Sequence, residues 1–413
     1  MTRTLVVGQD FPWPASIGSH LRLAQVVEAA GRLGEVDLFC LVPARRTAAC
    51  RLPEDVHVAR LETLTRPVPR RSWERRLWWA LASKRPLEVD QARLGAPARR
   101  FSAWARPDYD AVWFSKASTF ELLGRPRLGP SVVDLDDLED RKILGRLELV
   151  TAGGRHPARR AAARFQAKLD AGRWDRLQRS VSAAVDRVVL CSDLDAARAG
   201  FANCTVVPNG YPEPEVPVGR NEVGDPPTVL FAGSYCYGPN ADAARWLVSD
   251  IWPKVGAARP GAELRLVGEP DRSVGSLARD PGVSVVGEVT SMESELARAD
   301  VVVVPLRYGS GTRVKILEAF AHRIPVVSTA LGAEGLGVRA GVHLLVADEP
   351  RAFAEACIAL TTDASLRAGL VEEGQRLFHD RFRSEAVAGR VRSLLAEVAG
   401  APRAAEPVRS RSR

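Results

Sequence analysis

Short, uniformly apolar segments that alternate with helical stretches restrict the fold of this chain more than any other feature. Such segments fall at residues 4–7, 36–42, 111–114, 131–135 and 187–190, and again at 228–232, 263–267, 283–286, 301–305, 324–328 and 343–346. Amphipathic stretches, such as 240–255 and 312–321, separate several of them. Strands that are apolar on both faces are typical of parallel sheets covered by helices on both sides. The pattern predicts an α/β protein with two Rossmann-like, doubly wound parallel-sheet domains.

The stretch 211–227, YPEPEVPVGRNEVGDPP, separates the two series of strands. It is rich in proline and charge and has no periodicity, which predicts a linker. We therefore expect an N-terminal domain at 1–210 and a C-terminal domain at 228–379. The two domains should face a cleft, because ligands of open parallel sheets bind at the carboxyl ends of the strands. Residues 400–413 are expected to be a disordered tail.

Composition excludes several classes of protein. Of the 413 residues, 46% are hydrophobic and 26% are charged, which is average for a soluble globular protein. No run approaches the roughly 18 apolar residues of a spanning helix. The N-terminus lacks the apolar core and cleavage site of a signal peptide, so a cytoplasmic location is expected. The six cysteines are scattered, with no C-x-x-C pair, and no metal site is predicted from them.

The positive charge lies in the first half of the chain. Residues 1–215 contain 34 Lys and Arg against 26 Asp and Glu, whereas residues 216–413 contain 24 of each kind. Clustered positive charge attracts anions, so we expect an anionic partner or surface for the N-terminal half. No zinc-finger, RNP or helix-turn-helix pattern accompanies this charge, and no nucleic-acid partner is expected.

The segment 70–85, RRSWERRLWWALASKR, interleaves tryptophan with arginine. One interpretation is a basic amphipathic helix that makes peripheral contact with an anionic membrane at its inner, cytoplasmic face. The other is an ordinary helix whose tryptophans pack under the domain while its arginines are solvated. The second interpretation is favoured.

The segment 301–329 is the most informative part of the chain. An apolar strand is followed by a loop with Gly309, Ser310 and Gly311, and a helix is predicted to begin with Thr312 as its N-cap. Unpaired backbone N–H groups at a helix start, next to glycines that allow a ligand to approach closely, form an anion site.

Arg313 and Lys315 place two cations at the start of this helix. Cations there oppose the helix dipole, and a bound diphosphate would explain their presence. Lys315 is also one of only six lysines in the chain. Glu318 shares the face of Lys315 and is a candidate acceptor for ligand hydroxyl groups. The alternative is a surface pair of Lys315 and Glu318 beside a simple turn.

Two common nucleotide motifs do not fit. No G-x-G-x-x-G follows the first strand, and the spacing differs from a Walker loop. The block 309–329, GSGTRVKILEAFAHRIPVVST, instead resembles the donor-binding signature of the glycosyltransferase group 1 family, family 4 in the sequence-based classification, in its G-S-G-T-R-x-K-x-x-E form. Segments 206–210, 231–234 with 239–240, 286–289, and 299–301 with Pro305 resemble further parts of the family in the same order.

The resemblance implies the GT-B fold and a retaining, metal-independent transferase. It implies that the C-terminal domain binds a nucleotide diphosphate sugar, with UDP- or GDP-sugar expected as donor and no permanently bound cofactor. Arg313 and Lys315 would contact the diphosphate and act as catalytic residues. The donor-binding residues it implies are Gly18, Gly233, Gly287, Val289, Gly309, Ser310, Gly311, Thr312 and Glu318. A helix at 380–399 is expected to pack back on the first domain.

The chain departs from the family at two positions. Ser310 stands where many relatives have a glutamate near the donor sugar, which leaves the sugar open. Many relatives also have a histidine after an N-terminal strand, where this chain has Asp136 and Asp137. Asp136 is the candidate catalytic residue on the acceptor side. The acidic run 134–140 has two alternative interpretations, a metal site or a solvated loop and helix start, and the solvated form is favoured.

The sequence therefore predicts a retaining glycosyltransferase that moves a sugar to an acceptor hydroxyl of a glycan, as in polysaccharide biosynthesis, of a lipid carrier or of a small natural product. Two alternatives share the fold and the anion site. One is a GT-B type nucleotide-sugar epimerase, and the other is an inactive sugar-nucleotide-binding protein. Fold alone does not decide among them.

Overall fold

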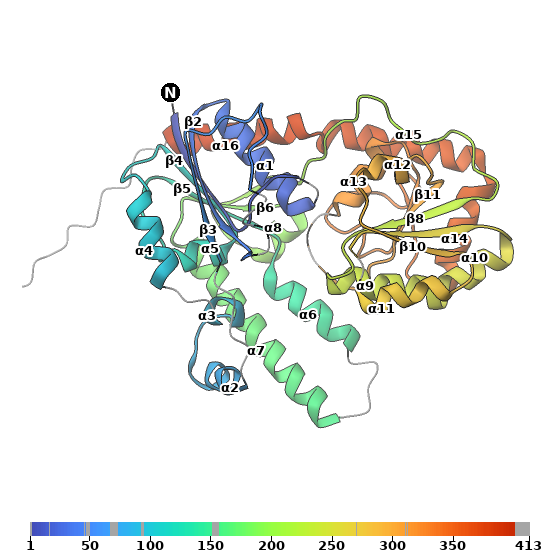
Figure 1. The fold of residues 1–413 in the computed structure, drawn as a ribbon, viewed down its shortest axis with the longest axis horizontal. Helices are drawn as coiled ribbons and strands as arrows, with labels where there is room; N and C mark the ends of the chain where they lie inside the picture. Colours follow the sequence, from blue (N-terminus) through green and yellow to red (C-terminus); the bar gives the residue numbers. More distant parts are fainter. Residues whose placement is uncertain are drawn as a thin grey trace, which may run out of the picture.

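A computed structural model of the chain describes residues 2–15, 17–44, 46, 50–66, 73–91, 95–150, 157–269, 271–309, 311 and 313–400. In this part of the chain two parallel sheets stand side by side, each with helices packed on both faces (Figure 1). The predicted α/β class with two doubly wound parallel sheets is confirmed.

The N-terminal sheet has the order β3-β2-β1-β4-β5-β6-β7, and every pairing in it is parallel. Its strands are β1 (Thr2–Gly8), β2 (Gly34–Val42), β3 (Arg60–Thr65), β4 (Ala111–Ser115), β5 (Ser131–Asp136), β6 (Arg187–Leu190) and β7 (Cys204–Val206). At its centre Val6 pairs with Leu38 on one side and with Trp113 on the other, and all three are fully buried. The order reverses between β1 and β4, and such a reversal opens a crevice at the carboxyl ends of the two strands.

The C-terminal sheet is built in the same way, in the order β10-β9-β8-β11-β12-β13. Its strands are β8 (Thr228–Ala232), β9 (Glu263–Val267), β10 (Val283–Gly287), β11 (Val301–Val304), β12 (Val326–Ser328) and β13 (Leu345–Val346). The four valines of β11 are buried, as expected for a central strand covered on both faces. Here the order reverses between β8 and β11.

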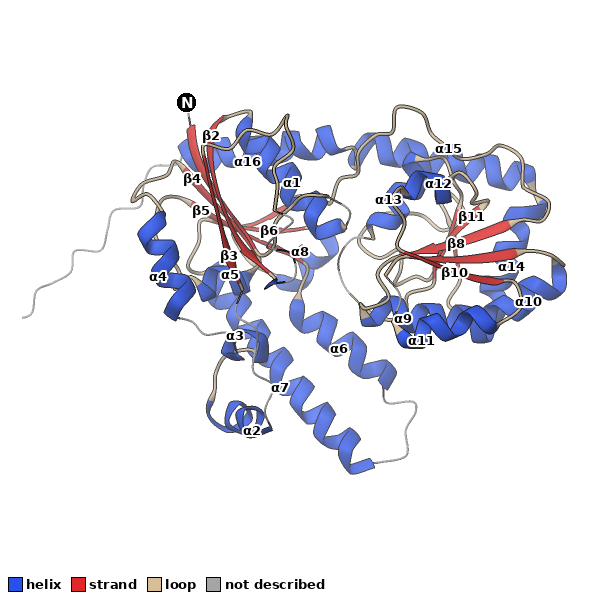
Figure 2. Ribbon diagram, in the orientation of Figure 1, coloured by secondary structure: helices blue, strands red, loops and turns tan. Residues whose placement is uncertain are grey.

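Helices cover both sheets (Figure 2). They are α1 (Gly18–Gly31), α2 (Trp73–Ala82), α3 (Leu87–Gln91), α4 (Gly95–Trp104), α5 (Ala117–Leu122), α6 (Glu139–Val150), α7 (Pro157–Ser182), α8 (Asp193–Ala199), α9 (Gly238–Trp246), α10 (Trp252–Ala258), α11 (Arg272–Gly275), α12 (Met292–Leu296), α13 (Val314–Ala321), α14 (Pro350–Thr362), α15 (Ala364–Arg381) and α16 (Ser384–Gly400). A π-helical turn, η2 (Leu247–Ile251), joins α9 to α10, and a 3-10 turn, η3 (Ser276–Arg279), follows α11. α6 and α7 project together beyond the N-terminal sheet (Figure 1).

The last helix returns to the first domain. α16 packs against α1, and its side chains Val391, Leu394 and Leu395 are buried in the same core cluster as Val6. Polar contacts join the two helices as well, because the Gln25 side-chain amide donates to Ser384 Oγ at 2.8 Å. A face of the N-terminal sheet is thus completed by residues from the far end of the sequence.

Several details differ from the expectations. β3 was not predicted, because its residues alternate in character and are only partly buried. The helical region predicted at 240–255 extends from Gly238 to Ala258 and contains the π-helical turn. Gly400, expected in the tail, is the last residue of α16, and the rest of the predicted tail, 401–413, lies outside the described residues. Between β7 and β8, residues 212–227 contain no helix or strand.

Candidate functional site

Residues that follow the central strands of the two sheets meet across the domains. A Cβ atom built on Gly18, the first residue of α1, would lie 3.0 Å from Val314 Cγ2 at the start of α13. A Cβ atom on Gly311 would lie 3.0 Å from Asp137 Oδ2 in the N-terminal domain. The Gly18 contact joins segments that follow β1 and β11, which flank the reversals of strand order where open α/β sheets bind ligands, and Asp137 follows β5, the strand next to β4. The structure therefore brings predicted site residues of both domains together.

Two glycines give the loop between β11 and α13 a backbone that other residues rarely adopt. Gly309 and Gly311 have φ angles of +127° and +82°, which side chains disfavour. α13 begins at Val314, and Arg313, which is only 8% exposed, occupies its N-cap position with no side-chain cap. The sequence placed Thr312 at that position. Ser310 and Thr312 both lie outside the described residues.

Lys315 is held by uncharged groups. Its Nζ donates to Asn240 Oδ1 at 3.0 Å and lies 4.6 Å from the centre of the Phe231 ring. No carboxylate in the described part of the chain lies within 4.0 Å of this ammonium group. Burial, with a further contribution from Arg313, lowers the pKa of Lys315 to about 7. A cation placed in this way gains most from an anion that arrives from outside.

The absence of a side chain at Gly233 leaves space for Lys315. This glycine follows β8 with a φ of +151°, and a Cβ atom there would lie 2.7 Å from Asn240 Nδ2 and 3.0 Å from Lys315 Nζ. A side chain at this position would displace one of them. Gly233 therefore belongs to the same local structure as Lys315, although the two are far apart in sequence.

Glu318 lies one turn after Lys315 and has a neutral partner. The Tyr211 hydroxyl donates to Glu318 Oε1 at 2.8 Å. Burial raises the pKa of Glu318, and burial together with this carboxylate raises the pKa of Tyr211. The alternative of a solvated surface pair of Lys315 and Glu318 is wrong, because burial shifts the pKa of both groups and each has another partner.

The other two predicted donor residues lie at a neighbouring strand end. Gly287 is the last residue of β10, has a φ of +82°, and has open space where a Cβ atom would be. Val289 follows it and packs against the C-terminal core. β10 is separated from β8 by β9.

The N-terminal side of the site is a compact cluster of opposite charges. Arg22 of α1 donates to both oxygens of Asp134 at 2.7 and 2.8 Å. Lys116 Nζ lies 3.2 Å from carboxylate oxygens of both Asp136 and Asp137, and Lys142 lies 3.4 Å from Asp137. The opposing carboxylates outweigh burial and raise the pKa of Lys116.

The favoured interpretation of the acidic run, a solvated loop, is wrong. Asp134 and Asp137 are only 3% and 6% exposed, because Asp134 lies within β5 against Arg22 and Asp137 directly follows this strand and faces Gly311 of the other domain. Their charges are balanced by cations instead of water. Within the described ranges, no group of three or more His, Cys, Asp and Glu side chains is arranged to hold a metal ion.

Lys116 and Asp136 also share an unusual backbone. Each follows or ends a central strand, and their φ angles are +73° and +63°. Left-handed backbone is uncommon for residues other than glycine, and it gathers at functional sites. The Asn209 side-chain amide donates to Asp136 Oδ1 at 3.2 Å, so this carboxylate is held on two sides. Its position agrees with a role that needs a fixed carboxylate.

Three contributors were missed at the sequence level, namely Lys116, Lys142 and Tyr211. A usable signal existed for the two lysines, because the chain has only six lysines and these two follow strand ends. Nothing local marked Tyr211, which comes from the segment between the domains and reaches Glu318 only in the folded chain.

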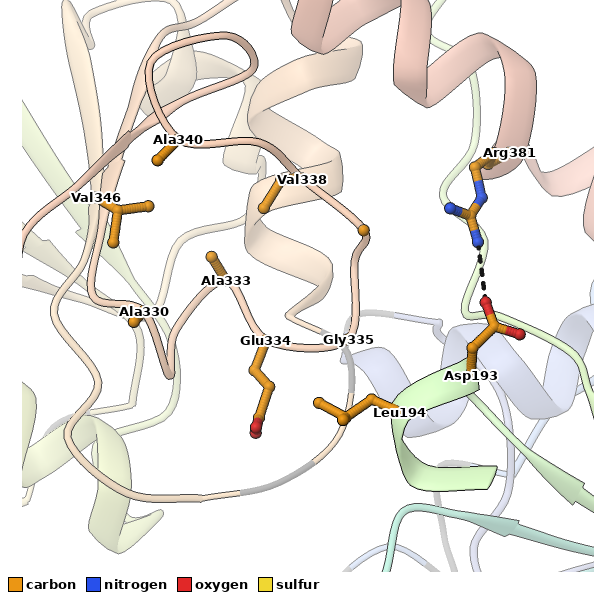
Figure 3. Close-up of a pocket in the computed structure, with 11 residues that line it drawn as sticks. Asp193, Leu194, Ala330, Ala333, Glu334, Gly335, Val338, Ala340, Val346 and Arg381 are labelled. Carbon is orange, nitrogen blue, oxygen red and sulfur yellow. Dashed lines mark ion pairs between the residues drawn. The ribbon is translucent and has the colours of Figure 1, made fainter. Parts of the chain in front are cut away.

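A separate hollow of about 460 Å³ lies between the domains on the β12 side (Figure 3). It is lined by Asp193, Leu194, Ala330, Ala333, Glu334, Gly335, Gly337, Val338, Ala340, Val346 and Arg381. An ion pair of 3.5 Å joins Arg381 to Asp193 at its edge, and Arg198 pairs with Glu334 at 2.5 Å. None of the predicted site residues lines this hollow. It is therefore distinct from the site around Lys315.

In the described part of the chain no helix combines the length and the apolar character needed to cross a membrane.

Comparisons with known proteins agree with this architecture. Residues 226–363 match the family model described as Glycosyl transferases group 1. A curated relative, an uncharacterized 44.6 kDa protein in the cps region of Klebsiella pneumoniae, is 26% identical over 137 residues, which cover 31% of this chain and 35% of the relative. The matched segment thus spans about a third of that relative.

Solved structures match over nearly the whole chain. Sucrose-phosphate synthase from Thermosynechococcus elongatus has a TM-score of 0.69 at 17% identity, covering 96% of this chain and 99% of its own. WaaG, a glycosyltransferase involved in lipopolysaccharide biosynthesis, has a TM-score of 0.62 at 13% identity, with 95% and 99% covered. HepE of Anabaena, solved with UDP-glucose, has a TM-score of 0.59 at 14% identity, with 96% and 100% covered. The chain therefore has the GT-B fold of these proteins, with a C-terminal domain that matches the glycosyl transferases group 1 model.

Proposed function

We propose that this chain is a retaining, metal-independent glycosyltransferase that moves a sugar from a nucleotide diphosphate sugar to an acceptor hydroxyl. The observation that carries the proposal is the setting of Lys315. This ammonium group lies in the first turn of α13, beside Arg313, with an amide and a ring as neighbours. A diphosphate supplies the negative charge that such a site attracts.

In the proposed reaction the bond between the anomeric carbon and the diphosphate oxygen breaks, while a bond to the acceptor oxygen forms on the same face of the sugar. Arg313, Lys315 and the N-terminus of α13 stabilise the charge that develops on the departing diphosphate. This is the part that a metal ion plays in other transferases. Glu318 accepts hydrogen bonds from the ribose hydroxyls in place of the one from Tyr211.

Asp136 orients the acceptor hydroxyl from the opposite domain. Its carboxylate is held by Lys116 and Asn209, so it presents a fixed acceptor atom at low entropic cost. Gly18, Gly309 and Gly311 allow the two domains to approach the diphosphate closely. Gly287 and Val289 lie near the base. Domain closure excludes water and limits hydrolysis.

The comparisons support this proposal. The family model covers residues 226–363, which contain every candidate donor-binding residue except Gly18. HepE of Anabaena was solved with UDP and with UDP-glucose, which favours a UDP-sugar among possible donors. The name of WaaG refers to lipopolysaccharide biosynthesis, which favours a glycan or lipid-linked acceptor over a small molecule.

Calorimetry and thermal shift with UDP, GDP, ADP and dTDP test the donor site. We expect one nucleotide to stabilise the wild-type chain by mass action, and the double variant Arg313→Ala/Lys315→Ala to lose that effect. A matched control is Arg351→Ala/Lys254→Ala, which removes two exposed cations of the same domain. Stabilisation by none of the nucleotides, or equal stabilisation of the double variant, contradicts the proposal.

A nucleotide-sugar epimerase is the competing function. It converts the donor with no acceptor present, whereas a transferase consumes the donor only slowly by hydrolysis in that condition. Incubation of the preferred nucleotide sugar alone, followed by chromatography of the sugar products, separates the two activities. An inactive binding protein leaves the donor unchanged both with and without acceptor.

We further propose that α2 contacts the inner, cytoplasmic face of an anionic membrane. Trp79 is fully buried, as the packing interpretation predicts, but Leu77, Trp78 and Leu81 are 52%, 58% and 79% exposed. Exposed Lys84 and Arg85 follow them. Apolar side chains next to cations favour the surface of an anionic bilayer. The side chains of Trp73 and Arg75 and all of residues 70–72 lie outside what the structure describes.

Sedimentation with vesicles tests this contact. We expect the wild-type chain to bind vesicles that contain phosphatidylglycerol and to bind neutral phosphatidylcholine vesicles weakly. Trp78→Ser/Leu81→Ser should lose most of the binding while the melting temperature stays unchanged. Replacing exposed Leu194 by Ser is the matched control on the same domain. Equal binding by both variants removes α2 from the contact.

A further inference from the structure

Asn240 fixes where the Lys315 ammonium group lies. Its side chain is 9% exposed and makes two hydrogen bonds, accepting from Lys315 Nζ at 3.0 Å and donating to the Ser234 carbonyl at 2.9 Å. The second bond sets the orientation of the amide, since only its nitrogen can donate. The oxygen is therefore directed at Lys315.

Two further groups close the space around the lysine. The Phe231 ring lies 4.6 Å from Nζ on one side. The backbone of Gly233 lies on another, and a Cβ atom at that position would clash with both Asn240 and Lys315. An ammonium group has three donors, and Asn240 accepts one of them. The remaining donors are left for a ligand.

The choice of an amide over a carboxylate has a chemical consequence. A carboxylate at position 240 would neutralise Lys315 permanently and compete with a phosphate for it. An amide positions the nitrogen without adding charge. With no carboxylate against it, Lys315 has a pKa lowered to about 7 by burial, so a large part of it is neutral near neutral pH.

The charged and titratable groups around Lys315 come from several elements, and they do not supply this missing carboxylate. They are Arg313 and Glu318 on the α13 segment, Tyr211 bonded to Glu318, Glu269 bonded to Ser234 after β8, and Asp137 across the cleft beside Gly311. Arg313 disfavours the charged lysine and Glu318 favours it weakly, while burial contributes most.

We propose that Asn240 is a positioning residue for Lys315, and that binding of a nucleotide diphosphate sugar is coupled to the uptake of one proton by this lysine. The inference rests on the proposed function, because the diphosphate is the anion that draws the proton. On binding, the neutral amine of Lys315 takes a proton from solvent and becomes the ammonium ion that pairs with a phosphate oxygen. The diphosphate of a nucleotide sugar is already fully ionised and releases no proton.

Calorimetry in buffers of different ionisation enthalpy tests the coupling. The ligands are UDP-glucose, GDP-mannose, ADP-glucose and dTDP-glucose, of which the one that binds is carried forward. We expect uptake of about half a proton per bound donor at pH 7 and nearly one at pH 8. The Kd should rise about tenfold per pH unit above pH 7.

Three variants assign the proton and the role of Asn240. Lys315→Arg keeps a cation that does not titrate, so donor binding should continue with no proton uptake and with a Kd independent of pH. Asn240→Asp should abolish the uptake, because its carboxylate holds Lys315 protonated, and should weaken binding at pH 7. The control Asn221→Asp adds the same charge at an exposed position of the segment between the domains and should behave as wild type.

The outcomes separate this inference from the proposed function. If the wild-type chain binds none of the four nucleotide sugars, the proposed function fails. If it binds one with no proton uptake between pH 7 and pH 8, the coupling is wrong and the proposed function stands. If Asn240→Asp keeps the wild-type uptake, Asn240 does not position the titrating group. Wild-type uptake in Lys315→Arg assigns the proton to another residue and overturns the inference.

Discussion

The two domains present cations at equivalent strand ends, but they treat them in opposite ways. At the N-terminal sheet, Arg22 and Lys116 are matched by Asp134 and Asp136 at distances of 2.7 to 3.2 Å. At the C-terminal sheet, Lys315 has an amide and an aromatic ring instead. In the first arrangement each cation has carboxylate partners within the protein, whereas in the second no carboxylate of the described residues lies within 4.0 Å of the ammonium group.

This difference shows that the partners of a shielded cation indicate whether its role is structural or in binding. A buried ion pair is weak evidence for added stability, although removing one member leaves the other uncompensated and is costly. A buried cation without a carboxylate lowers the stability of the empty protein. Such a residue points to a binding role, and substitutions should distinguish the two domains.

The largest effect is expected for the N-terminal cluster. Arg22→Met leaves the Asp134 carboxylate buried with no cation bonded to it and should cost about 3–5 kcal/mol of unfolding free energy in urea. Arg32→Met is the control on the same helix, where an exposed pair with Glu385 should contribute at most about 1 kcal/mol. A cost below about 1 kcal/mol for Arg22→Met would mean that the ion pairs of the N-terminal domain do not stabilise the fold, and the proposed difference between the domains would be wrong.

Lys315→Met should change how stability depends on pH. The folded pKa of about 7 lies below the ordinary value of 10.5, so the unfolded chain binds the proton more tightly between these values. Relative to the variant, the wild-type chain should therefore be less stable below pH 7 and should gain up to about 1.4 kcal/mol per pH unit above it. Urea titrations from pH 6.5 to 9.5 measure the difference, with Lys254→Met as control for an exposed lysine. Parallel curves for wild type and Lys315→Met contradict the setting of this lysine, which is partly buried with no carboxylate partner.

The smallest effect is expected for the partly exposed ion pair that links the domains. Arg198 and Glu334 have side chains that are 35% and 32% exposed. A double-mutant cycle with Arg198→Ala and Glu334→Ala should give a coupling of about 0.2–1 kcal/mol. A coupling above about 2 kcal/mol would mean that this pair, like Arg22 and Asp134, acts as a buried contact.

Much of the fold could be predicted from the sequence because its central strands carry a strong local signal. Each residue of β11 is an apolar, β-branched valine, and such a short run strongly favours a buried strand. The edge strand β3 was missed, because an edge strand is covered on fewer sides and its residues, RLETLT, have mixed character. The order of the strands in each sheet is a property of the whole chain and follows from no single segment.

The residues of the candidate site also differ in how well the sequence alone predicts them. Arg313, Lys315 and Glu318 are neighbours in sequence, and helical spacing places Lys315 and Glu318 on one face before any tertiary contact is known. Lys116 and Asp136 meet only when β4 and β5 pair, and the left-handed backbone of both residues has no mark in the local sequence. The rarity of lysine was the one sequence signal that singled out Lys116.

The return of α16 to the first domain affects how the protein can be made. Residues 384–400 fill a face of the sheet that begins with residue 2, and Gln25 bonds to Ser384 across 359 positions of sequence. During synthesis, the first domain emerges from the ribosome with that face only partly covered, by α1, while the whole second domain is still being translated. The domain that starts first is therefore finished last, and a chain that stops before α16 exposes apolar sheet to other proteins in the cell.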